Sequence, residues 1–169
     1  MKKIIILFLM FSAIVFAEWK YGMGHNNEGV NYHFFIVYDI YDNEQYSSLM
    51  FNVTLDIDNG MSSVIILNNN VKENDNLSLY INDNSGDSIN YSIFKKDIED
   101  GFIGIQNSDK YNRGNAISKL LVSAQSVELY NNDTEEILAT FDTKGLKEIL
   151  QKRLGNSYWY KYKLFGNWK

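Results

Sequence analysis

NAISKLLVSAQSVELYNNDTEEILATFDTKGLKEILQKRL, residues 115–154, is the stretch that decides the fold. It predicts a helix, two strands and a closing helix. In the closing part, FDTKGLKEILQKRL, apolar residues recur at helical spacing and charged or amide residues fill the positions between them. Each apolar side chain contributes roughly 1.5–3 kcal/mol when buried, so the helix needs a surface to cover. Those side chains are Leu146, Ile149, Leu150 and Leu154, and we expect a sheet beneath them.

The sequence before this stretch predicts that sheet. Apolar and polar residues alternate in short runs separated by Asn, Asp and Gly, which is typical of antiparallel strands joined by hairpins. The strongest hairpin signal is Asp58-Asn59-Gly60, which supplies the positive φ values of a tight turn. We predict a mainly β protein, an antiparallel β-sandwich or meander with two short α-helices near the C-terminus. The predicted strands cover residues 18–24, 31–41, 48–57, 62–68, 77–83, 88–95, 102–106, 126–130 and 137–141.

Cap residues mark one end of each predicted helix. Asn115 can cap the first helix, in which Ile117, Leu120 and Leu121 share one face. Gly155 can adopt the left-handed conformation that commonly follows a helix, and it therefore predicts where the closing helix ends.

The N-terminus has the pattern of a secretory signal peptide. Lys2 and Lys3 precede an apolar run over residues 4–15, and Ala17 ends a small-residue cleavage site. The run is shorter than the about 18 apolar residues that span a membrane, so we expect cleavage after Ala17 and no transmembrane anchor afterwards. The predicted organisation is a signal peptide over 1–17, a β-rich domain over 18–155 and an aromatic, basic tail over 156–169. The expected location is the periplasm or the medium.

The composition limits the kinds of catalytic group, metal site and partner that the protein can have. The chain contains no cysteine, which excludes thiolate catalysis and thiolate metal sites. Its formal charge is −5, and becomes −7 when Lys2 and Lys3 are removed with the signal. Such an acidic balance argues against non-specific binding to nucleic acid.

The tail SYWYKYKLFGNWK, residues 157–169, combines aromatic and basic residues. One interpretation is a basic aromatic strap that binds an anionic membrane surface or the sheet edge of a partner. The other is a last strand packed on the body, with lysines along its exposed edge. The candidate partner-binding residues are Tyr158, Trp159, Tyr160, Lys161, Tyr162, Lys163, Phe165 and Trp168.

Catalytic and metal-binding patterns are weak. His25 and His33 lack the spacing of a metal site, and we predict surface or hydrogen-bonded histidines. Carboxylates cluster at Asp56 and Asp58 and again over residues 97–100, where Asp97, Glu99 and Asp100 lie at a predicted turn. Asp is common in turns because it binds the backbone there, and we expect that role rather than catalysis.

Two loops have the oxygen-rich composition of a calcium site, residues 56–60 and 82–87. Neither has the twelve-residue pattern of an EF-hand with its closing Glu. We therefore predict turns, and no cofactor or metal.

Several motifs resemble a known family in their order along the chain. They are EWKYG, SLMFNVTLDIDNGMSSVIIL, LSLYINDNSGDSINY, AISKLLVSAQSVELY and ATFDTKGLKEIL. The last is similar to the phenylalanine-aspartate strand end and glycine-leucine helix start of the VasI/TagO-type exported accessory proteins of type VI secretion. Here Phe141 and Asp142 precede Gly145 and Leu146. A more distant likeness is to the invasion-associated locus B proteins. The usual cysteines of the VasI/TagO-type family are absent here, and the aromatic tail is additional.

These observations favour an exported, non-enzymatic accessory or interaction protein with an envelope or secretion-system partner. One alternative is an inhibitor or immunity-like protein that blocks another protein's active site. Another is a secreted enzyme or small-ligand binder, for example of cell-wall glycan. Such a binder would use the aromatic rings of Tyr158, Trp159 or Trp168 and the carboxylates of residues 97–100.

Overall fold

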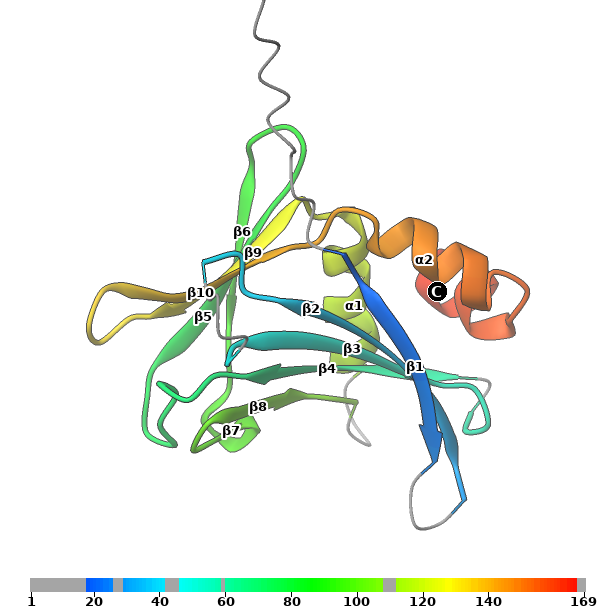
Figure 1. The fold of residues 1–169 in the computed structure, drawn as a ribbon, viewed down its shortest axis with the longest axis horizontal. Coiled ribbons are helices and arrows are strands. Elements are labelled where there is room, and N and C mark those ends of the chain that lie inside the picture. Colours follow the sequence, from blue (N-terminus) through cyan, green and yellow to red (C-terminus); the bar gives the residue numbers. More distant parts are fainter. Residues whose placement is uncertain (1–17, 26–28, 42–45, 59, 108–111, 167–169) are drawn as a thin grey trace, which may run out of the picture.

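The computed structural model describes residues 18–25, 29–41, 46–58, 60–107 and 112–166. The predicted signal peptide and Trp168 lie outside these residues. The described chain is mainly β and forms two antiparallel sheets, as predicted (Figure 1). No helix within the described ranges is long and apolar enough to span a membrane.

The first sheet has six strands. The two central strands pair antiparallel on either side of the predicted hairpin turn, with Phe51 opposite Val64. In spatial order the strands are β1 (Lys20–His25), β2 (Asn31–Tyr38), β3 (Ser48–Thr54), β4 (Met61–Leu67), β8 (Phe102–Ile105) and β7 (Ile98–Glu99).

The second sheet has four strands that do not follow chain order, which distinguishes the fold from a single meander. The chain enters this sheet after β4, leaves it after β6 and returns after α1. The two sheets meet where Asp39 pairs with Phe141 and the Ile40 N–H donates to the Thr140 carbonyl oxygen at 2.9 Å. The strands of this second sheet, in spatial order, are β10 (Glu136–Asp142), β9 (Ser126–Asn131), β5 (Leu77–Asn82) and β6 (Ser88–Ser92).

In β3 and β5, period-two alternation correctly predicts which residues face the core. Leu49, Phe51 and Val53 are fully buried, and the same is true of alternate residues in β5. The alternation fails at Ile57, which is 41% exposed because β3 ends at Thr54. The strand therefore stops three residues before the predicted end.

Two helices lie near the C-terminus, as predicted, and α2 ends next to Gly155 as expected, but both predicted caps are wrong. Helix α1 (Arg113–Ser123) begins after Asn112, so the predicted cap at Asn115 is wrong. Helix α2 covers Leu146–Leu154, but Gly155 has a right-handed φ of −57° and its N–H donates to the Gln151 carbonyl oxygen. The left-handed cap predicted there is wrong because the backbone continues in helical conformation toward the tail.

Helix α2 buries Leu146, Leu150 and Leu154, while Ile149 is only partly buried. Helix α1 lies against β4, and the main neighbours of α2 are α1 and the helical turn that follows. The prediction of a sheet directly beneath α2 is therefore wrong in part, because α2 packs mainly on α1 and on that helical turn, and it is α1 that lies against β4.

The tail is helical, so the prediction of a last strand is wrong. A short helix of the π type, η2 (Trp159–Leu164), follows α2 and lies beside it at one end of the molecule (Figure 1). Trp159 and Leu164 are five residues apart and both are buried. In a π-helical turn, which pairs residue i with i+5, these two side chains point the same way.

Candidate partner-binding surface

Trp159 anchors the tail in the core. Its side chain is 1% exposed, and its ring packs edge-on against Phe51 with centroids 6.0 Å apart. Gly60 lies directly against it, with a φ of +106°, and a Cβ added at Gly60 would be 2.4 Å from the Trp159 Cβ. Trp159 is therefore not available to a partner, and its predicted role as a contact residue is wrong.

A buried polar cluster ties this anchor to α1 and β4. The Asn115 Oδ1 atom accepts hydrogen bonds from the Ser62 N–H at 3.0 Å and the Ser62 hydroxyl at 2.7 Å. It also accepts a longer bond from the Trp159 indole N–H at 3.4 Å. Ser118 donates to the Gly114 carbonyl oxygen at 2.6 Å. Asn115 thus joins three elements, which explains why an amide stands inside the helix rather than at its start.

Further contacts fix the backbone of the tail. The Ser157 hydroxyl donates to the Leu154 carbonyl oxygen at 2.7 Å and accepts from the Tyr160 N–H at 3.1 Å. Lys119 donates to the Gly166 carbonyl oxygen at 3.1 Å. Lys163 is half-buried and donates to the Asp58 carbonyl oxygen, so its charge serves a contact within the chain.

On this fixed backbone, aromatic rings remain exposed. Tyr158 and Tyr162 are 53% and 61% exposed, and their ring centroids are 4.8 Å apart. Phe165 is 45% exposed and contacts the half-buried Tyr160 ring, centroids 5.0 Å apart. Lys161 is also exposed, and the Lys147 ammonium lies 5.7 Å from the Phe165 ring centroid. We call Tyr158, Lys161, Tyr162, Phe165 and Lys147 the C-terminal surface.

The charge of this region is opposite to that of the body. Residues 144–166 contain six basic residues and one acidic residue, a formal charge of +5. Residues 18–143 contain seven basic and twenty acidic residues, a formal charge of −13. The C-terminal surface is thus a basic, aromatic region on an acidic protein.

Comparison of the chain with protein-family models, with curated proteins and with solved structures finds no match. The family resemblance in the sequence motifs therefore stays a prediction.

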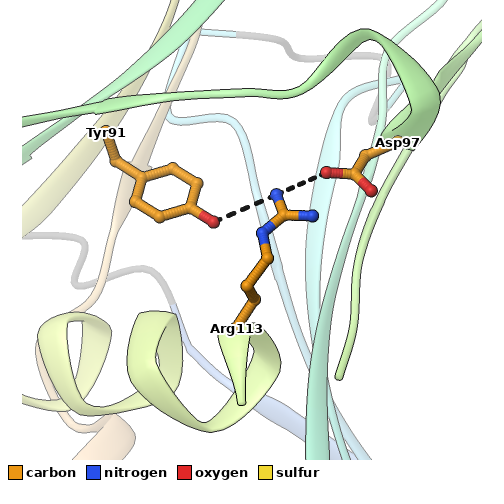
Figure 2. A network of polar contacts seen from close by, with 3 residues as sticks. All are labelled: Tyr91, Asp97 and Arg113. Carbon is orange, nitrogen blue, oxygen red and sulfur yellow. Dashed lines mark hydrogen bonds and ion pairs between the residues drawn. The ribbon is translucent and has the colours of Figure 1, made fainter. Parts of the chain in front are cut away.

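Asp97, one of the candidate catalytic carboxylates, is paired with a cation. The Arg113 guanidinium lies between Asp97 and Tyr91 (Figure 2). Its Nη2 atom is 2.5 Å from the Asp97 carboxylate and 3.2 Å from the Tyr91 hydroxyl. The side chains of Arg113 and Asp97 are only 11% and 8% exposed. Burial alone would lower the pKa of Arg113, but the hydrogen bonds to Asp97 and Tyr91 outweigh it and raise this pKa. Asp97 thus holds the start of α1 against the segment before β7.

The oxygen-rich loop at residues 82–87 is a turn stabilised by its own carboxylate, whereas Asp56 of the other loop accepts hydrogen bonds from Asn31 in β2. Asp83 accepts from the Ser85 N–H at 2.8 Å and the Asp87 N–H at 3.0 Å, and the bonds to Ser85 lower the pKa of Asp83. Asp56 accepts from the side-chain amide of Asn31 at 3.1 Å. Among the described residues, no group of three or more His, Asp or Glu side chains is placed to hold a metal.

The two histidines do not form a pair. His25 is exposed at the end of β1 opposite Asn31, whereas His33 in β2 lies opposite Met23. The His33 Nδ1 atom is 2.9 Å from the Tyr21 hydroxyl. Burial lowers the pKa of His33, and the nearby Asp56 carboxylate opposes this effect. Each histidine fits its predicted role, one on the surface and one hydrogen-bonded.

Proposed function

We propose that this protein is an exported, non-enzymatic interaction module that binds an acidic surface of an envelope or secretion-system protein through its C-terminal surface. One observation carries the proposal: Tyr158, Tyr162 and Phe165 are exposed on a segment whose backbone is held by the buried Trp159 and Leu164.

Exposed aromatic rings on a fixed backbone suit protein recognition. Tyrosine and phenylalanine are enriched in interface cores, where they bury large areas with few rotatable bonds. A backbone that is already ordered loses little further entropy when a partner binds, so more of the contact energy appears as affinity. The anchors of the tail therefore favour binding by the rings that remain outside.

The charge of the surface indicates the kind of partner. Lys147 lies near the Phe165 ring and Lys161 is exposed, both in a segment of charge +5, while the body of the protein carries −13. Complementary charge speeds association and excludes partners of like charge. We therefore propose an acidic protein face as the partner, and the acidic body would repel such a face in any other orientation.

Export and the absence of catalysis are parts of the same proposal. Export is supported by the signal-peptide pattern over residues 1–17, and the type VI accessory role by the resemblance of the sequence motifs. A non-enzymatic role is supported by the engagement of Asp97 in an ion pair. The glycan-binding alternative loses two of its residues, because Trp159 is buried and Asp97 is paired.

Site-specific photo-cross-linking in the native cells tests this function. p-Benzoylphenylalanine replaces Tyr158 or Tyr162, and, as a matched control, Tyr41, which is 79% exposed on the acidic body. We expect one defined envelope or secretion protein to be cross-linked from positions 158 and 162 and not from position 41. We expect Lys161→Glu to reduce the yield.

Three outcomes would contradict the proposal. They are equal cross-linking from all three positions, cross-linking to lipid alone, and no adduct at position 158 or 162. An enzyme recovered as the partner, with its active site in the adduct, would instead support the inhibitor alternative.

A further inference from the structure

A cleft of about 500 Å³ lies where the end of α2 approaches β2, separate from the C-terminal surface. One wall is formed by the His33 side chain and Leu55, and the other by the last turn of α2 and the backbone that leads into the tail. Its volume is within the range of about 300–1,000 Å³ that is usual for small-molecule sites. The polar residues that line it are His33, Gln151, Lys152, Arg153, Asn156, Ser157 and Tyr160.

Tyr21 positions two of the groups that define the cleft. Its hydroxyl is 2.9 Å from His33 Nδ1, and its ring lies under the Arg153 guanidinium, with the Arg153 Cζ atom 4.4 Å from the ring centroid. A guanidinium stacked in this way keeps its N–H edge for hydrogen bonding. Because the Tyr21 hydroxyl already engages Nδ1, the other nitrogen of His33 is the one left to face a ligand.

The charge of the lining favours an anion. Lys152 and Arg153 line the cleft, and none of the described lining residues is acidic. Asp56 and Glu148 act on His33 and Tyr160 from outside the lining. Asp56 is engaged by Asn31, and no carboxylate in the described ranges forms an ion pair with Arg153.

We infer that this cleft binds a small organic anion of about the size of a sugar, with Arg153 as the main anion contact. The Arg153 fork binds the carboxylate or phosphate of the ligand, and the amide and hydroxyl groups of Gln151, Asn156 and Tyr160 bind its polar body. This site is independent of the proposed partner surface, since no residue of the C-terminal surface lines it.

NMR titration of the mature protein with D-glucuronate, glucose 6-phosphate and glucose tests the site. The two imidazole signals are well suited to detect binding, because His33 lines the cleft and the exposed His25 serves as an internal reference. We expect the His33 signal to shift on adding at least one of the two anions, with a Kd on the order of 1 mM or below. Glucose should bind at least about tenfold more weakly. The two anions distinguish a carboxylate from a phosphate ligand.

Charge-matched variants connect the binding to Arg153. Arg153→Gln should weaken binding by about tenfold or more, and Lys144→Gln, which removes the same charge outside the cleft, should leave it unchanged. Arg153→Lys keeps the positive charge but loses the paired N–H donors of the guanidinium, so we expect an intermediate affinity. Amide spectra check that each variant is folded. The inference is overturned if neither anion shifts His33, if glucose binds as well as the anions, or if Lys144→Gln weakens binding as much as Arg153→Gln does.

Discussion

Replacing Trp159 with alanine should unfold the anchor of the tail and destabilise the whole domain. Trp159 is 1% exposed and contacts Phe51 and Gly60 in the core. A buried aromatic side chain removes about 150–250 Å² from water, worth roughly 4–6 kcal/mol at 25 cal/mol per Å². The methyl group of alanine retains part of this burial energy, so we expect the free energy of unfolding to fall by about 3–5 kcal/mol.

The indole hydrogen bond contributes little to this loss. It is 3.4 Å long, and after Trp159→Ala the Asn115 Oδ1 atom still accepts two hydrogen bonds from Ser62. No unsatisfied polar atom is therefore created at Asn115. Trp159→Phe keeps most of the packing and should cost less than half as much as Trp159→Ala. The loss from alanine is a large part of the about 5–15 kcal/mol by which domains are stable.

Urea unfolding followed by far-UV circular dichroism measures the effect. The midpoint should fall strongly for Trp159→Ala, and Tyr162→Ala, at an exposed position in the same helical turn, should change stability by no more than about 0.5 kcal/mol. A loss below about 1 kcal/mol for Trp159→Ala would refute the account, because it would approach the about 0.5 kcal/mol that limits the effect of most surface substitutions. The tail would then not be packed in the core.

Three other predictions follow from the buried contacts. Asp97→Asn leaves the nearly buried Arg113 charge without its counter-ion, and it should lower the free energy of unfolding in urea by about 2–4 kcal/mol. The double change Asp97→Leu with Arg113→Met removes both charges and should cost less. An equal or greater cost of the double change would contradict the ion-pair argument. Burial lowers the pKa of His33 below its usual 6.5, so the unfolded chain binds the proton more readily than the folded one. The contribution of His33 to the free energy of unfolding is therefore complete above about pH 6.5 and declines as the pH falls below it. An NMR titration should show that the pKa of His33 falls further in Asp56→Asn. An unchanged pKa would show that Asp56 does not act on His33. Gly114→Ala places a Cβ 2.0 Å from the Ser62 carbonyl oxygen and should cost about 1–3 kcal/mol or more, whereas Ser123→Ala on the exposed end of α1 should be nearly neutral; equal stability of the two variants would argue against the close approach of α1 to β4.

Local patterns predicted the elements well, and distant contacts account for most errors. Alternation at Leu49, Phe51 and Val53 and the turn at residues 58–60 depend on neighbouring residues, so the sequence alone predicts them. The order of strands in the second sheet depends on pairings between distant segments, as between Leu77 and Asn131, and no local signal specifies these. Asn115 illustrates the same limit, because an amide typical of helix starts instead binds Ser62 on another element.

The strand interpretation of the tail is wrong because alternating aromatic and basic residues also occur in a helical turn. The signal that could have corrected this is the five-residue spacing of Trp159 and Leu164, which fits a wide helical turn. The charge contrast between residues 144–166 and the body could also be counted from the sequence. The cleft could not be predicted, since Tyr21, His33 and Arg153 come together only in the folded chain.

The most direct test of the central claim measures partner binding and unfolding on the same variant, Tyr158→Ala with Tyr162→Ala. The partner is the protein identified by cross-linking, and Tyr41→Ala is the control. We predict that the double variant binds at least about tenfold more weakly, while its free energy of unfolding changes by less than about 1 kcal/mol. Unchanged affinity, or a loss of affinity that only accompanies a comparable loss of stability, would contradict a surface built for binding on a separately anchored segment.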